Sequence, residues 1–408
     1  MRTVVIVADF GYVEGGAAKV ALDSVRLLQE AGLAVILFCG SERVAPEIEH
    51  LGIRIVRLGQ HELKDHPNKL VAMRDGLWNR LAARRLKELL ATQDPKETIV
   101  HIHSWTKILS PSVFSVLRKS GFRTILTAHD YFLGCPNGAI YDYVKKRPCP
   151  YRGGSLRCLL CNCDARNYGH KIWRWVRQRI VTFQLRRFAD LELVTISNLA
   201  ERHLQEQIGT RNRCVRVTTP MQFGSEKATA EEIQGAFVFI GRVSAEKDPL
   251  TFAEAVSRCG VKGIVIGDGE LLAEMKLRYP EIEYAGWRNA SMVREILATR
   301  SIALVFTSVW YEGAPLTPLE AMSVGVPCII SDRTNATEYI QDGRTGLLFK
   351  CGDVDDLCGK IAALKNPSYR KMLSENIKRE FDQETYSEQT YVSKLLKLYA
   401  ESVHKERA

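Results

Sequence analysis

Short apolar runs alternate with amphipathic stretches along nearly the whole chain. The first run covers residues 2–8, a helical pattern follows over 17–31, and a second run covers 33–38. Runs that are apolar throughout are typical of strands buried on both faces of a parallel sheet. The order strand, helix, strand predicts right-handed crossovers between parallel strands. Further strands are predicted at 53–58, 98–102, 124–128, 191–196, 215–218, 236–240, 263–266, 282–285, 301–307, 328–331 and 346–349.

The pattern restarts after an irregular stretch at 220–234, which we interpret as a linker between two domains. A chain of 408 residues is also too long for one hydrophobic core. We expect an α/β fold with one domain over residues 1–219 and a second over 233–385, each built on a parallel sheet. The remaining segment, 386–408, begins with an amphipathic pattern that predicts a C-terminal helix.

Composition excludes some classes of protein and favours certain partners. Apolar residues make up 46% of the chain and charged residues 25%, as in soluble globular proteins. No apolar run approaches the length of a membrane span, and Asp9 and Gly11 interrupt the first run where a signal peptide would continue. We therefore expect a cytoplasmic protein. The net charge of +10 favours phosphates, nucleic acid or an anionic membrane surface as partners.

Residues 310–327, WYEGAPLTPLEAMSVGVP, hold two carboxylates beside a predicted helix start. Proline is tolerated only in the first turn of a helix, so Pro318 places the start near residues 314–316. Glu312 then precedes the helix, and Glu320 lies in its first two turns. Backbone N–H groups at a helix start bind anions, and ligands of open parallel sheets lie beyond the carboxyl ends of the strands. The alternative is a capped helix whose apolar residues pack inward.

Other loops at predicted strand ends carry groups suited to phosphate. Arg242 and Lys247 flank a strand-to-helix turn, where two cations and a helix dipole suit a diphosphate. Gly15 and Gly16 precede the first helix and would let the backbone approach a phosphate, although the dinucleotide fingerprint is absent. His129 follows the strand at 124–128. The alternatives are exposed loop cations, an ordinary turn and a solvated histidine.

Five cysteines lie close together in a stretch that is rich in proline, glycine and arginine: Cys135, Cys149, Cys158, Cys161 and Cys163. In a cytoplasmic protein, such a cluster favours thiols or metal ligands over disulfides. Cys158, Cys161 and Cys163 would share one loop, and Cys149, or alternatively Cys135, would complete a tetrahedral set of thiolates. The prediction is a structural zinc ion or an iron–sulfur cluster, and the alternative is free thiols.

A strongly basic segment overlaps and follows the cysteines. Residues 144–190 contain twelve Lys or Arg against two Asp. We expect a helix in its second half that resembles an interfacial membrane helix, with arginines around an apolar face. The alternative is a surface helix that packs on the sheet through the same apolar residues. No nucleic-acid-binding motif is present, so nucleic acid is not expected. The apolar face would consist of Ile172, Trp173, Val176, Ile180, Phe183 and Leu185.

In combination and in this order, the motifs resemble those of retaining glycosyltransferases of the GT-B type, family four, also called glycosyl transferases group 1. The motifs are Gly15-Gly16, His129, G-R-x-x-x-x-K at 241–247, G-D-G at 267–269 and E-x7-E at 312–320. The resemblance spans nearly the whole chain, except for the cysteine-rich basic insert at about 134–187. It implies two facing Rossmann-like domains, with a C-terminal helix that crosses back to the first domain.

The resemblance also implies substrates and residue roles. The donor would be a UDP- or GDP-linked sugar, and the acceptor a saccharide or lipid-linked saccharide in surface polysaccharide or glycolipid synthesis. Catalysis would need no cofactor. Arg242 and Lys247 would hold the diphosphate, Glu312 the sugar hydroxyls and Glu320 the ribose, while His129 would approach from the acceptor side. The other donor contacts would be Gly15, Gly16, Gly267, Gly286, Trp287, Gly313, Ala314, Pro315 and Leu316.

The chain departs from the family pattern at two places. Lys19 stands where the family often has arginine, and Thr219-Pro220 replaces a frequent Asn-Pro. The basic segment favours a membrane-linked acceptor and a peripheral position on the inner face of the membrane. The alternatives are a GT-B-shaped epimerase or phosphorylase, and an inactive nucleotide-sugar-binding or membrane-docking subunit. The charges at Glu312, Glu320, Arg242 and Lys247 argue against an inactive subunit.

Overall fold

The computed structural model describes residues 2–188, 191–209, 213–224 and 235–404. The chain divides into two compact units. The first unit contains Met1–Val144, Cys149–Met221 and Glu384–Ala408, and the second contains Lys145–Pro148 and Gln222–Gln383. Most of the predicted linker at 220–234 lies outside the described residues.

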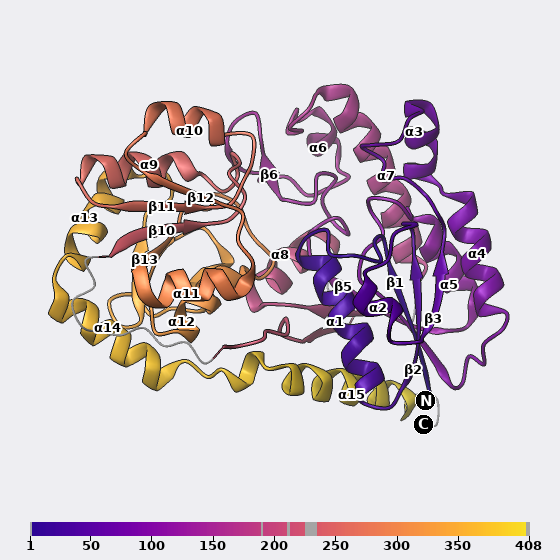
Figure 1. Cartoon of the computed structure of the whole chain (residues 1–408). Helices are drawn as coiled ribbons and strands as arrows, with labels where there is room; N and C mark the ends of the chain where they lie inside the picture. The colour runs from indigo at the N-terminus through magenta and orange to yellow at the C-terminus, as the bar shows by residue number, and fades with distance from the viewer. Residues whose placement is uncertain (1, 189–190, 210–212, 225–234, 405–408) are drawn as a thin grey trace. The chain divides into compact units, whose positions relative to one another are not determined.

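The first unit is built on a parallel sheet of seven strands, in the order β3-β2-β1-β4-β5-β8-β9 (Figure 1). Adjacent strands pair in parallel throughout, as the continuous apolar runs predict. The strands are β1 (Thr3–Ala8), β2 (Ala34–Cys39), β3 (Arg54–Arg57), β4 (Thr98–Ile102), β5 (Arg123–Ala128), β8 (Leu191–Thr195) and β9 (Cys214–Arg216).

Helices connect these strands and cover both faces of the sheet. They are α1 (Gly16–Glu30), α2 (Pro46–Glu49), α3 (Lys69–Leu77), α4 (Arg80–Leu90), α5 (Ser112–Ser120), α6 (Leu156–Leu160), α7 (Tyr168–Arg186), α8 (Asn198–Ile208), η2 (Glu384–Tyr386) and α15 (Glu388–His404). A further short strand, β6 (Tyr141–Asp142), lies in the insert between β5 and α7.

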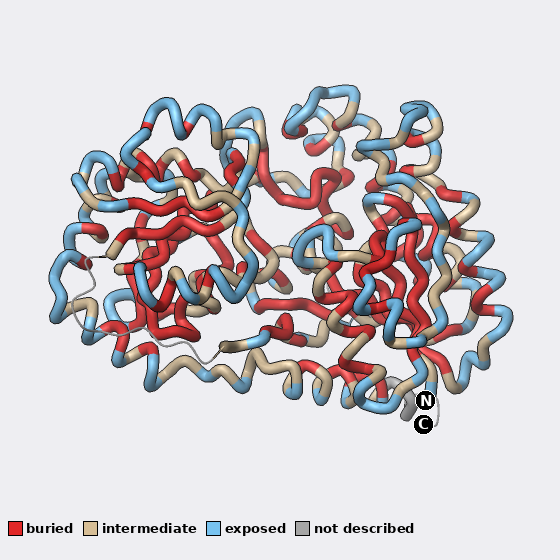
Figure 2. Tube along the Cα trace, in the orientation of Figure 1, coloured by how far each residue is buried: buried red, intermediate tan, exposed pale blue. Residues whose placement is uncertain are grey.

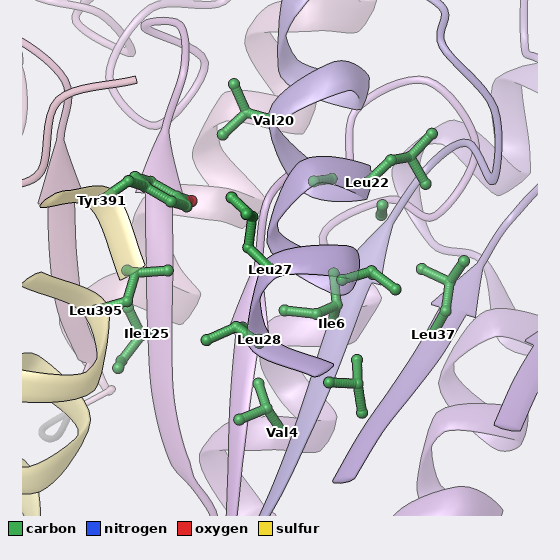
Figure 3. Packing of buried hydrophobic residues seen from close by; sticks show 14 of the residues in the cluster. Val4, Ile6, Val20, Leu22, Leu27, Leu28, Leu37, Ile125, Tyr391 and Leu395 are labelled. Carbon is green, nitrogen blue, oxygen red and sulfur yellow. The ribbon is translucent and has the colours of Figure 1, made fainter. Parts of the chain in front are cut away.

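The C-terminal helix α15 packs in the core of the first unit, as predicted. Figure 3 shows its Tyr391 and Leu395 beside residues of α1 such as Leu27 and Leu28. The hydroxyl of Tyr391 lies 2.7 Å from Oγ of Ser24 on α1. These contacts join the end of the chain to its first strands in one hydrophobic cluster.

The second unit holds a parallel sheet of six strands, in the order β12-β11-β10-β13-β14-β15. All its strands except the edge strand β12 are mainly buried, and Figure 2 draws the central strands of both sheets mainly in red. The strands are β10 (Ala236–Ile240), β11 (Gly263–Ile266), β12 (Glu283–Gly286), β13 (Ser301–Phe306), β14 (Cys328–Ser331) and β15 (Gly346–Phe349), and a two-residue strand is β7 (Arg147–Pro148). The helices are α9 (Pro249–Arg258), α10 (Leu272–Arg278), α11 (Ala290–Arg300), α12 (Leu316–Ser323), η1 (Asn335–Glu338), α13 (Val354–Leu364) and α14 (Pro367–Glu380).

The predicted α/β fold with a parallel sheet in each half is confirmed. Most strand predictions agree with the structure to within one or two residues, and those at 98–102, 236–240, 263–266, 328–331 and 346–349 agree fully. The prediction at 215–218 extends two residues past β9 (Cys214–Arg216), which lies at the edge of the sheet. An edge strand is buried on fewer sides, so its apolar pattern is weaker.

Candidate active site

A buried ion pair lies at the carboxyl edge of the second sheet. Nζ of Lys247 is 2.6 Å from Oε2 of Glu312, and the two side chains are 20% and 10% exposed. Lys247 belongs to the loop after β10, and Glu312 to the loop after β13. Because β10 and β13 are neighbours in the sheet, their carboxyl ends meet at one edge, where ligands of open parallel sheets bind.

Glu312 has two further hydrogen-bond partners besides the ammonium of Lys247, one at its side chain and one at its backbone. The hydroxyl of Ser308 donates to Oε1, and the side-chain amide of Asn335 donates to the backbone carbonyl of Glu312. Ser308 follows β13, and Asn335 lies on η1 after β14. Ser308 and Asn335 were not predicted from the sequence. Their position just beyond apolar strands is the signal that would have selected them.

The two loops that carry the ion pair are tied to each other. Oγ1 of Thr307 donates to the carbonyl of Lys247 at 2.9 Å, and the amide of Val309 donates to the carbonyl of Glu246 at 3.0 Å. The backbone on both sides of the ion pair is therefore fixed. A site with fixed backbone holds its charges in place without a ligand, which lowers the cost of reorganisation during reaction.

Arg242, on the same loop as Lys247, reaches toward solvent. Its side chain is 71% exposed, and its nearest carboxylate is Glu246, with Nη1 and Oε1 3.9 Å apart. A contact of this length in solvent contributes little. Most of the guanidinium is therefore open to an anionic ligand, whereas Lys247 already has a carboxylate partner.

The helix start after Glu312 agrees with the prediction from its prolines. Helix α12 begins at Leu316, Pro315 is its N-cap, and Pro318 lies in its first turn. The N–H groups of Leu316 and Thr317 precede the first acceptors within the helix, so they point out of its end. Gly313 and Ala314 form the approach to this end. Glu320 is half-buried in the second turn.

Glycines shape the neighbouring loops after β10 and β11. Gly267 has φ +141°, and a Cβ on it would lie 1.9 Å from the carbonyl oxygen of Gly241. Gly269 has φ +159°, and its Cβ would lie 2.3 Å from the carbonyl oxygen of Val243. The G-D-G segment thus packs directly against the loop that carries Arg242 and Lys247, which explains both glycines without a ligand.

Gly286 and Trp287 end the next strand of the same sheet. Gly286 has φ +68°, and Trp287 is 74% exposed. Such a large exposed indole offers a flat surface for a planar ring. The predicted donor residues of the second unit are 242, 247, 267, 286, 287, 312–316 and 320, which lie at the end of β12, on the loops after β10, β11, β12 and β13, and on α12.

The predicted residues of the first unit lie at the carboxyl ends of its strands. Gly15, with φ +107°, is the N-cap of α1, and Gly16 is the first helical residue. A Cβ on either glycine would meet no atom within 4 Å, so no packing contact demands them. His129 follows β5 and is half-buried. Its Nε2 lies 3.2 Å from Nδ1 of His103.

Three histidines form a row at this edge of the first sheet. His101 and His103 are buried on β4 and just after it, and Nδ1 of His101 lies 2.7 Å from the hydroxyl of Tyr399 on α15. Burial lowers the pKa of His101 to about 3 and that of His129 to about 4. His129 is therefore a neutral imidazole near pH 7, which donates or accepts hydrogen bonds but carries no charge.

Asp9, which ends β1, is a buried carboxylate that the sequence analysis did not select as a site. It accepts backbone N–H bonds from Lys107, Ile108 and Leu109 at 2.9–3.0 Å. Burial raises the pKa of its carboxyl, although these bonds oppose the rise. Asp9 thus anchors the loop after β4 to the first strand, a structural role.

The structure does not assemble the predicted metal-ligand set from the five cysteines. Nζ of the fully buried Lys171 lies 3.3 Å from Sγ of Cys158 and 3.1 Å from Sγ of Cys163. Cys161 instead contacts Oδ2 of Asp142 at 3.5 Å. Among the residues that the structure describes, no group of three or more His, Cys, Asp and Glu side chains is placed to hold a metal ion. The sequence analysis missed Lys171, which occupies the space beside the sulfurs.

The thiol group of Cys163 has an unusual environment. A hydrogen bond with Cys149, together with the Lys171 ammonium, lowers the pKa of Cys163. Burial by itself lowers the pKa of Lys171, but the sulfurs of Cys158 and Cys163 outweigh burial and raise it. The other two thiols, Cys135 and Cys149, are buried, and burial raises the pKa of Cys135. The cluster therefore stabilises the insert through an ammonium–sulfur contact.

Two parallel-sheet units with anion-suited loops at their carboxyl edges define a protein of the GT-B class. Residues 15–220 match the family described as glycosyl transferase 4-like domain, and residues 223–380 match glycosyl transferases group 1. The chain therefore belongs to the group 1 glycosyltransferases of the GT-B type. This confirms the family resemblance and the two Rossmann-like domains.

Solved structures of low sequence identity share the fold. Sucrose-phosphate synthase from Thermosynechococcus elongatus has a TM-score of 0.72 and 15% identity, over 98% of this chain and 99% of the other. HepE from Anabaena, in complex with UDP, has a TM-score of 0.69 and 13% identity, over 98% of this chain and all of the other (100%). These likenesses support the two-unit architecture.

A curated relative matches part of the chain. UDP-Gal:alpha-D-GlcNAc-diphosphoundecaprenol alpha-1,3-galactosyltransferase from Escherichia coli is 28% identical over 158 residues, which are 35% of this chain and 40% of the relative. The chain aligns with only 29–40% of the length of the curated relatives that it matches.

Proposed function

We propose that this protein is a retaining glycosyltransferase that moves a sugar from a nucleotide diphosphate sugar to a saccharide or lipid-linked saccharide. The observation that carries the proposal is the Lys247–Glu312 pair, fixed beside the open end of α12 and close along the chain to the exposed Arg242. A diphosphate with a sugar presents both anionic oxygens and hydroxyls. This edge offers cations and N–H groups for the former and a carboxylate for the latter.

Each group at the edge is assigned the part of the donor that matches its chemistry. Arg242, Lys247 and the N–H groups of Ala314 and Leu316 hold the diphosphate and stabilise charge as it leaves. Glu312 accepts hydrogen bonds from sugar hydroxyls, and Glu320 accepts them from the ribose. The remaining donor contacts, at the base and along the phosphates, are assigned to Trp287, Gly286, Gly267, Gly313 and Pro315.

The first unit is assigned to the acceptor, with His129 at the carboxyl edge of its sheet, while Gly15 and Gly16 at the same edge remain proposed donor contacts. The neutral imidazole of His129 suits a hydrogen bond to a hydroxyl or phosphate oxygen. The proposed reaction does not require a metal ion, because Arg242, Lys247 and the N–H groups of the helix start supply the positive charge for the leaving diphosphate. The proposed outcome is retention of the anomeric configuration, with attack from the face that the nucleotide leaves.

UDP is the favoured nucleotide and a lipid-linked glycan the favoured acceptor. The HepE structure holds UDP, and the E. coli relative is named for a UDP-galactose donor and a diphosphoundecaprenol acceptor. The basic segment at 144–190 fits work at an anionic membrane surface, and we place the protein peripherally on its cytoplasmic face. No helix in the described part of the chain has the length and hydropathy to span a bilayer.

A panel of UDP- and GDP-sugars tests the proposal. Purified protein is incubated with each donor, with and without acceptor, and both nucleotide release and thermal shift are recorded. We expect at least one UDP-sugar to stabilise the protein and release UDP, and nuclear magnetic resonance of the product to show the donor's anomeric configuration. If no donor gives either response, an inactive subunit of a glycan assembly complex becomes the better description.

Lys247→Ala tests the assignment of the diphosphate. Removal of a preorganised cation from the leaving group is expected to lower kcat by about 100-fold or more, as is Arg242→Ala. Lys262→Ala, which removes an exposed cation of the same unit, is the control and keeps normal turnover. Near-normal turnover of both Arg242→Ala and Lys247→Ala would refute the role of these cations.

A further inference from the structure

The buried side of helix α7 is mostly polar, although Val181 and Leu185 are also buried. Its buried residues include Lys171, Arg177, Gln178 and Gln184. Soluble helices normally place the apolar stripe toward the core. The expectation of one apolar face with Leu185 in it was also wrong, because Leu185 is buried and the other apolar residues are partly exposed. Tyr168, Ile172, Val176 and Phe183 are exposed by 38%, 42%, 38% and 48%.

The exposed apolar side chains of α7 lie along one side of the helix. Ile172, Val176 and Phe183 recur at helical spacing, with Arg179 and Arg186 at the intervening positions of the same series. The short helix α6, which packs on α7, adds Leu156 and Leu160, with 73% and 76% of their surfaces exposed. At the place of α6 in Figure 1, the tube in Figure 2 is largely pale blue. The surface formed by α6 and this side of α7, here called the α6–α7 face, is apolar enough to mark an interaction site.

A pocket borders the α6–α7 face. It has a volume of about 240 Å³ and is formed by the end of α8, the second half of α7 and the loops at 133–134 and 152–155. Three arginines line it, Arg152, Arg179 and Arg186, together with the backbone of several glycines. None of the lining residues in the described chain is acidic. A pocket of this size is slightly smaller than the ~300–1,000 Å³ of drug-sized ligand sites and suits a small anionic group.

Hydrogen bonds link the segments that line the pocket. Nε2 of the buried Gln178 donates to the carbonyl of Leu133 at 2.7 Å, and Oε1 of Gln207 accepts from the amide of Gly153 at 2.7 Å. Nε of Arg152 donates to the carbonyl of Gln207 at 2.9 Å. The first bond ties α7 to the loop at 133–134, and the other two tie the loop at 152–155 to α8. Nη1 of Arg179 also donates to the carbonyl of Gly154 at 3.4 Å, which links α7 to the loop that carries Arg152.

Charge around the pocket is mainly positive, although the exposed Glu206 of α8 directly precedes the lining residue Gln207. Between residues 149 and 188, Asp164 is the one acidic residue, and it is buried against His170 and Arg174, at 2.9 and 3.1 Å. Exposed arginines outside the pocket are Arg157, Arg166 and Arg187. The outward charge of the α6–α7 face is therefore positive.

We propose that the α6–α7 face binds an anionic membrane, with the phosphate of a lipid headgroup in the pocket lined by Arg152, Arg179 and Arg186. The apolar side chains of α6 and α7 would enter the interface between headgroups and acyl chains. This inference rests on the membrane-surface part of the proposed function and adds a specific headgroup site to it. A free phosphate would satisfy the arginines alone, whereas a lipid also accounts for the apolar residues beside them.

Sedimentation of the full chain with vesicles tests the proposal. The vesicles contain phosphatidylcholine with or without phosphatidylglycerol, and three variants are compared with the original protein. The pocket variant carries Arg152→Ala, Arg179→Ala and Arg186→Ala, and the flank variant carries Arg157→Ala, Arg166→Ala and Arg187→Ala, with the same loss of charge. The apolar variant carries Leu156→Ser and Leu160→Ser. Circular dichroism and thermal unfolding confirm that each variant is folded.

We expect the pocket variant to lose about tenfold or more binding to anionic vesicles relative to the flank variant, because a specific site adds to the general attraction of arginine for an anionic surface. The apolar variant should lose binding to both vesicle types. Equal losses in the pocket and flank variants would overturn the headgroup site. A thermal shift by inorganic phosphate that the pocket variant loses, without any loss of vesicle binding, would make free phosphate the ligand and overturn the lipid.

The failure of this inference is distinguishable from the failure of the proposed function. Transfer to a water-soluble acceptor should be the same in the pocket variant and the original protein, since none of the residues that line the pocket is assigned to the donor or the acceptor. Vesicle binding that depends on the pocket, in a protein inactive with every donor, would retain the inference and reject the transferase.

Discussion

Two buried carboxylates at strand ends, Asp9 and Glu312, are stabilised in different ways. Asp9 accepts three backbone N–H groups and is fully occupied by its own unit. Glu312 instead faces the ammonium of Lys247 and the hydroxyl of Ser308. An ammonium on a flexible stem is able to exchange its partner for a ligand more readily than a backbone N–H. Glu312 is for this reason the carboxylate that suits a functional role.

Glu312→Gln should separate the effect of the Lys247–Glu312 pair on turnover from its effect on nucleotide binding. The amide preserves the shape and the bond to Ser308 but removes the negative charge beside Lys247, so the ammonium should attract phosphate more strongly. We expect kcat to fall by about tenfold or more, while UDP binds at least as tightly. Calorimetry with UDP and turnover assays measure the two effects. Glu254→Gln, on the exposed side of α9, is the control, and weaker UDP binding by Glu312→Gln would contradict the assignment.

The buried histidines predict a loss of stability in acid. The pKa of His101 is about 3 in the folded protein, below the ~6.5 of an exposed histidine. Below pH 6.5 the unfolded chain therefore binds more protons than the folded chain. The free energy of unfolding decreases as the pH is lowered from about 6.5 to the folded pKa. One such histidine contributes at most about 1.4 kcal/mol per pH unit in this window.

His101→Gln should reduce this pH dependence. Hydrogen exchange of β4 amides at pH 7.5 and pH 5.5 gives the change in opening free energy, which should be smaller in the variant by about 1 kcal/mol. Glutamine retains hydrogen-bonding groups toward Tyr399 and Thr127, the present partners of the ring. His50→Gln, at an exposed position, is the control. If the opening free energy of the β4 amides changes equally with pH in His101→Gln and the original protein, His101 is not the source of the pH dependence.

At the scale of elements, α15 joins the last residues of the chain to the core of the first unit. Leu395 is fully buried among residues of α1 and the sheet. Leu395→Ala should lower the free energy of unfolding of this unit by about 2–5 kcal/mol, through lost burial and a cavity. Lys397→Ala, on the exposed side of the same helix, should change it by about 0.5 kcal/mol or less. Urea unfolding followed by hydrogen exchange measures both, and a loss below about 1 kcal/mol in Leu395→Ala would show that the helix docks only weakly.

The elements that the sequence predicted well are those with a strong local constraint. Continuous apolar runs predicted most strands of both sheets, and Pro318 placed the start of α12 near residues 314–316, in agreement with its start at Leu316. At the candidate site, Glu312, Lys247 and Arg242 were predicted because they lie in the turns between such strands and the helices that follow. The partners Ser308 and Asn335 were missed, since their contacts depend on how three loops meet in space.

The basic insert was the part least predictable from sequence. Periodicity identified α7 as a helix, but the buried side of this helix carries Lys171, Arg177 and Gln178. Hydrophobic patterns assume that apolar residues face the core. Here a buried ammonium is stabilised by the sulfurs of Cys158 and Cys163, a pairing between residues of different elements that no spacing rule contains.

At the scale of the molecule, the two units divide the chemistry of the proposed reaction. The donor residues Arg242, Lys247, Glu312 and Glu320 all belong to the second unit, whereas His129 and the glycine pair belong to the first. Each unit has its own parallel sheet and hydrophobic clusters. A ligand that contacts one unit should therefore stabilise that unit directly.

UDP without a sugar should protect the second unit from hydrogen exchange. Binding to the folded state alone stabilises it by about 2.7 kcal/mol when the ligand is present at 100 times its Kd. The largest protection is expected at the loop after β10 and at the start of α12, and the smallest in β1 and β2 of the first unit. Mass spectrometry of exchanged peptides from the full chain gives the measurement. Lys247→Ala is the matched control, since it should remove most of the protection at the same UDP concentration. Protection confined to the first unit would place the nucleotide on the wrong sheet for the residues assigned here and would reverse the assignment of donor and acceptor units.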